Sequence, residues 1–211
     1  MARIREPLPN FLLYHSLKWS IVAPIVHTYF RGLIHGMENI PSEDPLVIVS
    51  NHASNYDPPI ISNCVRRPVA YMAKEELFHI PVFKKAIQLC GAYPVSRGSA
   101  DRQAIRDALK FLDNGWAVGL FLEGTRTPTG RIINPKRGAA LIAAKAKVPI
   151  LPVSLWGTQE IEKNGIIPRP VAVTVRIGKL IDAPTSTDKD ELEAITQKCA
   201  DTINSLHDLG R

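Results

Sequence analysis

The sequence predicts one α/β domain whose mostly parallel or mixed sheet is flanked by helices, preceded by an apolar N-terminal helical segment. Apolar runs rich in β-branched residues end abruptly at polar ones, as residues 46–49 do at Ser50. Residues 116–123 are apolar almost without interruption, which is typical of a strand buried on both faces. Stretches with a helical period, most clearly residues 99–115, lie between such runs. Strands that alternate with helices favour a largely parallel sheet.

The first part of the domain begins with a turn-rich connector at residues 35–45, followed by the strand at 46–50. Next we expect a short helix with proline in its first turn, a strand, a helix interrupted by a proline, and a short strand. These elements cover residues 58–65, 68–74, 75–90 and 91–95.

The second part of the domain contains the clearest helix, with Ser99 as its N-cap and Gly115 at its C-terminal end. Asp188 and Glu191 have the spacing of a capping box and predict the start of a last helix, which reaches about residue 207. Between them we expect a strand, a polar loop, a helix and two further strands. They cover residues 116–123, 124–136, 138–147, 150–157 and 171–178.

Composition narrows the class of protein. A chain of 211 residues with 45% hydrophobic and 22% charged residues suits one globular domain. The three cysteines are widely spaced and odd in number, which argues for a reducing compartment and against a disulfide framework or a zinc site. The net charge of +6 suits anionic lipid or phosphorylated substrates. Nucleic acid is disfavoured, because the basic residues form no block and do not alternate with aromatics.

The N-terminal segment, residues 10–30, is strongly apolar and carries the interface-type residues Tyr14 and Trp19. Charged, polar or helix-breaking residues interrupt it: His15, Lys18, Pro24 and His27. These interruptions argue against a spanning helix and a secretory signal. Two interpretations remain, a helix packed on the domain's core and a helix lying in a membrane interface, and we favour the second. The chain then divides into a membrane-interface segment, residues 1–35, and an α/β domain, residues 36–211.

His52 and Asp57 follow the strand that ends at Ser50 and are separated by four residues. A carboxylate bonded to one imidazole nitrogen fixes the tautomer and leaves the other nitrogen able to take a proton. Capping of the next helix by Asp57 also explains the spacing, so the spacing alone is weak evidence for catalysis. No Gly-x-Ser-x-Gly elbow supplies a nucleophile. A base here would therefore act on a hydroxyl brought by the substrate.

A second polar cluster, "EGTRTPTGR", follows the strand at 116–123. Glu123 ends the strand, Gly124 permits close backbone approach, and Arg126 offers a guanidinium suited to phosphate. Arg97 closes another short strand. Because ligands bind beyond the carboxyl ends of parallel strands, these groups and His52 are expected at one pocket. For the other basic residues nearby, a solvated surface position is as good an interpretation: Arg131, Lys136 and Arg137.

These motifs, in this order, resemble the glycerolipid acyltransferase family that includes bacterial 1-acylglycerol-3-phosphate acyltransferases. "NHASNYD" matches the family's Asn-His-x₄-Asp block, "GAYPVSR" its second block, "EGTR" its third and "VPILPV" its apolar fourth. The resemblance covers residues 37–178. The second block departs from the commoner form, since Ser96 stands where an acidic residue often precedes the arginine.

The resemblance implies a role for each matched residue. His52 would deprotonate the acceptor's hydroxyl, which attacks an acyl thioester, and Asp57 would orient His52. Arg97 and Arg126 would hold the acceptor's phosphate, while Glu123 shapes that site. The implied substrate-binding residues are Arg97, Glu123, Gly124, Thr125 and Arg126, with Lys136 and Arg137 as possible secondary phosphate contacts.

The activity implied is transfer of a fatty acyl group to 1-acyl-glycerol-3-phosphate, giving phosphatidate, a step of phospholipid biosynthesis. The resemblance implies no cofactor and no metal, with acyl-CoA or acyl carrier protein as co-substrate. Its expected partners are a lysophospholipid acceptor and a membrane surface, without nucleic acid. The expected location is the cytoplasmic face of the membrane, as a monotopic or peripheral protein.

Several alternatives stay open at this point. The acceptor could be another lysophospholipid or hydroxyl compound. The same His-Asp pair could activate water in an acyl thioester hydrolase, although water needs no phosphate-binding arginine. A non-enzymatic lipid-binding domain would not need the pair. A metal-dependent phosphatase built on His52, Asp57 and Glu123 lacks the further histidine or carboxylate cluster that a metal shell requires.

Overall fold

The computed structural model describes most of the domain and little of the N-terminal segment. The described residues are 16, 20, 23–41, 44–65, 69–74, 79, 92–95, 102–163 and 168–211. Four predictions made from the sequence lie outside these residues: most of the apolar N-terminal helix, nearly all of the helix at 75–90, the Ser99 N-cap and the role of Arg97. The predicted N-terminal helix is therefore not confirmed.

A seven-stranded mixed sheet forms the centre of the domain, in the order β1-β7-β6-β2-β5-β3-β4. Only the pairing of β6 with β7 is antiparallel among the strand pairs of the described residues. The strands are β1 (Leu33–His35), β2 (Leu46–Ser50), β3 (Val69–Lys74), β4 (Tyr93–Val95), β5 (Ala117–Phe121), β6 (Ile150–Trp156) and β7 (Thr174–Ile177). The predicted α/β class with a mostly parallel or mixed sheet is confirmed.

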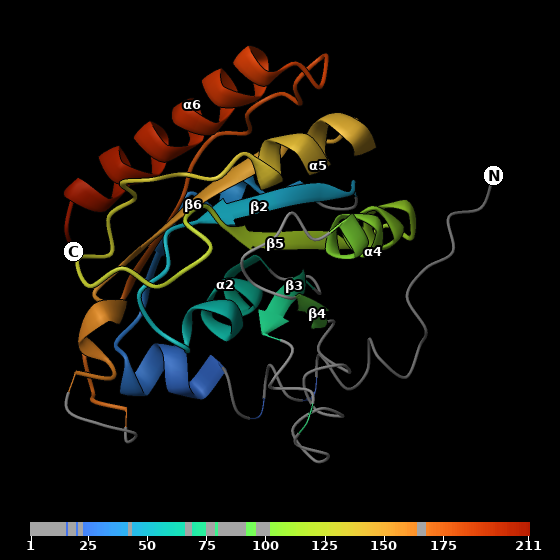
Figure 1. Ribbon diagram of the computed structural model, residues 1–211. Helices are drawn as coiled ribbons and strands as arrows, with labels where there is room; N and C mark the ends of the chain where they lie inside the picture. Colours follow the sequence, from blue (N-terminus) through green and yellow to red (C-terminus); the bar gives the residue numbers. More distant parts are fainter. Residues whose placement is uncertain are drawn as a thin grey trace.

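The helices cover both faces of this sheet, as Figure 1 shows. Three of them, α4, α5 and α6, contribute to the apolar core on one face, and α2 contributes to the core on the other face. The α-helices are α2 (Asp57–Val65), α4 (Arg102–Asp113), α5 (Gly138–Ala146) and α6 (Lys189–Asp208). The shorter helical turns are η2 (Ile25–Tyr29), η3 (Met37–Asn39) and η5 (Thr158–Glu160).

Strand β2 is the central element that positions the site. It pairs with β5 on one side and β6 on the other, so Ser50 lies opposite both Phe121 and Val153. All five residues of β2 are buried. Val47 and Val49 pack in the core with α4, α5 and α6, whereas Leu46 and Ile48 pack in the core with α2. Burial on both faces is why the strand is an unbroken apolar run, and the chain becomes polar where the strand ends.

Two local features differ from the sequence prediction. Strand β1 was not expected, because three residues at the sheet edge carry no measurable periodicity. The predicted capping box at α6 is wrong: Asp188 makes no side-chain cap bond. Glu191 instead accepts hydrogen bonds from the backbone N–H groups of Thr185, at 2.6 Å, and Ser186, at 3.0 Å. The Asp188 N–H donates to the Ser186 hydroxyl. Glu191 therefore bonds the backbone N–H groups of residues 185 and 186 and not that of residue 188, as a capping box would require.

The described end of the N-terminal segment packs against the domain. Val26 and Phe30 are each 1% exposed and belong to the core shared with α2. Ile25 and Tyr29, on the same helical turn, are large apolar side chains exposed to solvent. None of the helices in the described part of the chain combines the length and apolar character needed to cross a bilayer.

Candidate active site

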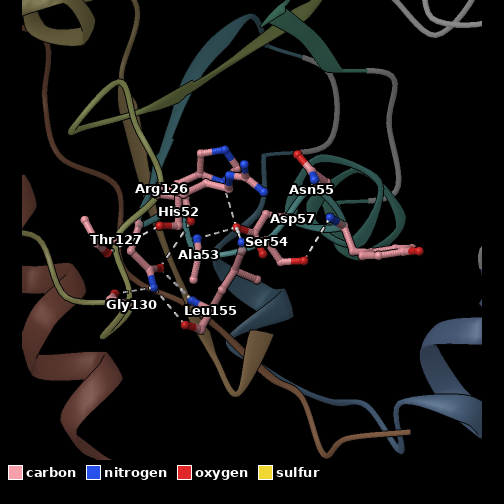
Figure 2. A network of polar contacts seen from close by, with 12 residues as sticks. His52, Ala53, Ser54, Asn55, Asp57, Arg126, Thr127, Gly130 and Leu155 are labelled. Carbon is pink, nitrogen blue, oxygen red and sulfur yellow. Dashed lines mark hydrogen bonds and ion pairs between the residues drawn. The ribbon is translucent and has the colours of Figure 1, made fainter. Parts of the chain in front are cut away.

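His52 and Asp57 are in direct contact. The Nδ1 atom of His52 lies 2.7 Å from Oδ2 of Asp57, and their side chains are 11% and 0% exposed. Figure 2 shows this pair on the turn between β2 and α2. The structure therefore brings together the two residues that the sequence singled out, at the end of a buried strand.

The surroundings of Asp57 assign the roles of the imidazole nitrogens. Its Oδ2 atom also accepts hydrogen bonds from the backbone N–H groups of Ala53, at 2.7 Å, and Ser54, at 2.9 Å. Because this oxygen is an acceptor in both bonds, its contact with His52 fits a proton on Nδ1, and in the neutral ring that tautomer leaves Nε2 as the acceptor. The amides precede Asp57 in the chain, so this oxygen closes the turn that carries His52.

The ring of His52 is also held by stacking. It lies against the ring of Phe121, the last residue of β5, with 3.9 Å between centroids and 13° between planes. Phe121 in turn stacks on Tyr71 of β3, with 5.9 Å between centroids. The His52 backbone carbonyl accepts the N–H of Thr127 at 2.8 Å, which joins the histidine's turn to the loop after β5. Ring contact and backbone contact together leave His52 little freedom to rotate.

Asn51 anchors the turn that carries His52. Its amide nitrogen donates to the carbonyls of Gly130, at 2.6 Å, and Leu155, at 2.8 Å, and its oxygen accepts the Leu155 N–H at 2.8 Å. The side chain is buried. Asn51 therefore ties the residue before His52 to β6 and to the loop after β5. The sequence showed it only as a motif position.

Glu123 and Gly124 shape the loop after β5. Glu123 Oε1 accepts hydrogen bonds from the backbone N–H groups of Ile133 and, at 2.8 Å, of Asn134. Gly124 has a φ of +68°, a conformation that disfavours any side chain, and a methyl group added there would meet nothing within 4 Å. In the described residues the glutamate thus acts on the loop backbone, and the glycine provides the left-handed turn.

Arg126 lies beside the His-Asp turn, whereas Lys136 and Arg137 lie elsewhere. Arg126 is 49% exposed, and its Nη1 atom is 3.7 Å from Oε2 of Glu162. Thr125 is exposed on the same loop. Arg137 pairs with Glu193 of α6 at 3.4 Å. Lys136 and Arg137 line an open hollow of about 590 Å³ against α6, and neither His52 nor Arg126 is among its lining residues.

The predicted phosphate contacts therefore fall into separate groups. The structure brings Arg126 close to the His-Asp turn, and it places Lys136 and Arg137 against α6. Arg97 lies outside the described residues, so its role stays a prediction. Among the described residues, no cluster of three or more histidine, cysteine, aspartate or glutamate side chains could hold a metal ion.

Glu162 is a site residue that sequence reasoning missed. Its carboxylate accepts hydrogen bonds from the Ser54 hydroxyl and from the Asn55 backbone N–H, each at 2.7 Å. Burial raises the pKa of Glu162, but the hydrogen bonds from Asn55 and Ser54 and the charge of Arg126 outweigh it, so the pKa lies below the usual value. No local signal could have identified this residue, because more than a hundred positions separate it from its partners.

The sequence model of the acyltransferase family matches residues 32–156, which include His52, Asp57 and Arg126. The chain belongs to the acyltransferase family. The matched region runs from just before β1 to the end of β6, and so contains the central strand and both strands that flank it. The resemblance stated from the motifs is thereby confirmed.

Curated relatives of this family member carry one recurring name. The chain is 33% identical over 166 residues to the chloroplastic 1-acyl-sn-glycerol-3-phosphate acyltransferase BAT2 of Brassica napus, covering 77% of this chain and 46% of the relative. It is 31% identical over 174 residues to the 1-acyl-sn-glycerol-3-phosphate acyltransferase of Borreliella burgdorferi, covering 81% and 69%. The chain spans less than half the length of BAT2 and of the Arabidopsis thaliana relative LPAT1, 46% and 41%.

A solved structure has the same fold. The 1-acyl-sn-glycerophosphate acyltransferase PlsC from Thermotoga maritima superimposes with a TM-score of 0.73 at 28% sequence identity. The match covers 92% of this chain and 81% of that one. The likeness therefore extends beyond the motif-bearing region to most of the domain.

Proposed function

We propose that this protein transfers a fatty acyl group from an acyl thioester to the free hydroxyl of 1-acyl-glycerol-3-phosphate, giving phosphatidate. The observation that carries the proposal is the His52–Asp57 contact of 2.7 Å, with Arg126 on the adjoining loop. The names of relatives from bacteria and plants, which are 31–33% identical to this chain, support the choice of acceptor.

In this mechanism His52 acts as a general base on the acceptor. The acceptor's hydroxyl gives its proton to Nε2 of His52 while its oxygen attacks the thioester carbonyl carbon. The tetrahedral intermediate then collapses, the carbon–sulfur bond breaks, and the imidazolium returns the proton to the departing sulfur, which leaves as a thiol. Asp57 stabilises the imidazolium through the bond at Nδ1. A positioned base of this kind contributes about 10²–10⁴ in rate.

The acceptor's phosphate would bind to Arg126. Its guanidinium is half exposed and can make two parallel hydrogen bonds to a phosphate. Glu123 supports this site indirectly, because it fixes residues 133 and 134 of the loop that begins with Gly124 and Thr125. Arg97 remains a proposed second phosphate contact.

The acceptor and product are lipids, so we also propose that the enzyme works at a membrane surface, on its cytoplasmic face. Three large apolar side chains of the N-terminal segment are exposed and support contact with a membrane surface: Ile25 at 40%, Tyr29 at 39% and Leu33 at 40%. The proposed donor is acyl-CoA or acyl carrier protein, and the chemistry above needs no cofactor. The net charge of +6 suits anionic lipid and anionic donors alike.

The test is thiol release from long-chain acyl-CoA by the purified protein in liposomes, with and without 1-acyl-glycerol-3-phosphate. We expect release that depends on the acceptor and yields phosphatidate in equal amount. Release that is equal without the acceptor would identify a thioester hydrolase instead. If acyl-CoA is not consumed, acyl carrier protein replaces it as donor in the same assay. Absence of transfer with both donors would refute the proposal.

A further inference from the structure

Glu162 joins the two parts of the site, although it lies outside every motif. It follows β6 and the helical turn η5, and it faces the turn between β2 and α2. Besides the bonds from Ser54 and the Asn55 backbone, its Oε1 atom accepts the side-chain amide of Asn55 at 2.7 Å. Its Oε2 atom lies 3.7 Å from Arg126. One carboxylate therefore contacts both the turn that carries the base and the arginine proposed to bind phosphate.

The turn that carries His52 is held from two sides by carboxylates. Asp57 accepts the N–H of Ala53 and of Ser54, and Glu162 accepts the next N–H along the chain, that of Asn55. Glu162 also accepts the Ser54 hydroxyl. Loss of the Glu162 bonds would free one side of the turn and allow Asp57 and His52 to shift together. A displacement of about 1 Å at a reacting group can lower a rate about 100-fold.

The contact with Arg126 differs from the others in strength. A separation of 3.7 Å is longer than a hydrogen bond, and the arginine is 49% exposed, so the ion pair is loose. A phosphate can offer Arg126 two short bonds in its place. Glu162 keeps its bonds to Ser54 and Asn55 when Arg126 turns away, because they involve other donors. The negative charge of Glu162 therefore competes with the acceptor's phosphate for Arg126.

Resting on the function proposed above, we propose that Glu162 is a positioning residue with two separable effects on acyl transfer. Its hydrogen bonds hold the turn of His52 and so sustain kcat. Its charge holds Arg126 in the free enzyme and so raises KM for the phosphate-bearing acceptor. A carboxylate that served only to stabilise the fold would change the melting temperature without dividing its effects between kcat and KM.

The experiment compares Glu162→Gln and Glu162→Ala with the wild type, using 1-acyl-glycerol-3-phosphate in liposomes. Glutamine keeps an acceptor for Ser54 and the Asn55 N–H but loses the charge, and the Asn55 amide can turn over to match it. We expect Glu162→Gln to lower KM for the acceptor about 3–10-fold with kcat within about threefold of the wild type, since charge competition at an exposed arginine is modest. We expect Glu162→Ala to lower kcat about 10–100-fold.

The matched control is Glu160→Gln. Glu160 lies two positions away on the same segment and pairs at the surface with Lys163, at 3.1 Å, so its variant should leave kcat and KM unchanged. Melting temperatures measured on all variants identify any loss of folded protein. A KM for Glu162→Gln equal to or above the wild-type value, or a kcat for folded Glu162→Ala equal to that of the wild type, would overturn the inference. Absence of acceptor-dependent transfer in the wild type would instead refute the proposed function, and the inference with it.

Discussion

The ring of His52 lies flat against the ring of Phe121, with 3.9 Å between their centroids. The contact joins the end of β2 to the end of β5, the two strands whose terminal residues Ser50 and Phe121 lie opposite each other in the sheet. Stacking therefore adds to the bond from Asp57 in setting the angle of the imidazole. Phe121 was predicted only as part of an apolar strand.

Replacing Phe121 by leucine should lower kcat, with a smaller effect on the free energy of unfolding. An aromatic contact of this kind contributes about 0.5–1.5 kcal/mol beyond burial, so we expect kcat to fall about 3–10-fold. Phe111→Leu is the matched control, because Phe111 packs in a separate aromatic group, tilted against Tyr93 and edge-on to Trp116. That variant should lose stability but keep the kcat of its folded fraction. Steady-state kinetics with equal kcat for both variants would show that the stack does not position His52.

Removal of His52 should abolish most of the proposed activity without unfolding the protein. His52→Ala is expected to lower acyl transfer about 10²–10⁴-fold, because the proposed general base is removed. The circular dichroism spectrum and liposome binding should change little. Transfer within a factor of ten of the wild-type rate would show that another group takes the proton.

Asp57→Asn should affect both activity and stability. The amide oxygen can still accept the three hydrogen bonds that Oδ2 accepts, from Ala53, Ser54 and His52, but it carries no negative charge to strengthen them or to stabilise an imidazolium. We expect a loss of kcat comparable to that of His52→Ala and a loss of stability of about 1–3 kcal/mol from the buried turn. Urea denaturation and kinetics on the same preparations measure the two losses. Full activity in this variant would contradict the orienting role.

Gly130 should tolerate alanine less well than Gly124 does. Both have positive φ, +71° and +68°, so each substitution costs about 1–2 kcal/mol of backbone strain. A methyl group at Gly130 would also lie 2.9 Å from Nε2 of His207, whereas at Gly124 it would meet nothing within 4 Å. In urea denaturation, we expect Gly130→Ala to lower the free energy of unfolding by about 1–3 kcal/mol more than Gly124→Ala does. Equal losses would show that His207 moves aside freely.

His207 should make the fold sensitive to mild acid. Burial lowers its pKa below the ordinary 6.5; Asp208 opposes this shift, and the charges of Arg131 and Arg176 add to it. The unfolded chain then binds the proton more readily than the folded one, so stability is full above about pH 6.5 and falls as the pH drops towards the folded pKa. For one such group, the slope of the unfolding free energy against pH approaches about 1.4 kcal/mol per pH unit.

His207→Gln is the variant that isolates this contribution. Unfolding free energies at pH 7.5, 6.5 and 5.5 should fall more steeply for the wild type than for the variant. The other histidines are the same in both proteins, so the difference between the two curves belongs to position 207. Parallel curves would show that His207 binds its proton equally well in the folded and unfolded chains.

Much of the fold could be predicted from the sequence, because its signals are local. Strands β2, β5 and β6 are mostly apolar runs that lie largely buried in the sheet, and β2 stops at the polar Ser50. The His52–Asp57 pair could be predicted for the same reason, because the two residues lie five positions apart on one turn.

The rest depends on contacts between distant segments, which leave no periodic pattern. The antiparallel direction of β7 is decided by its pairing with β6, and an alternating apolar strand looks the same in either direction. Arg137 could be recognised as a cation, but its partner Glu193 lies on a helix more than fifty positions away. Glu162 was missed for the same reason.

The place of β2 in the sheet has a consequence for how the chain is made. Both neighbours of β2 follow it in the sequence, β5 ending at Phe121 and β6 at Trp156. During synthesis at about 5–20 residues per second, the strand that leads to the histidine therefore waits several seconds for its partners. Until then its two edges present unpaired backbone groups and apolar side chains. The central position that makes the site rigid also leaves the nascent chain exposed to aggregation until β6 has been translated.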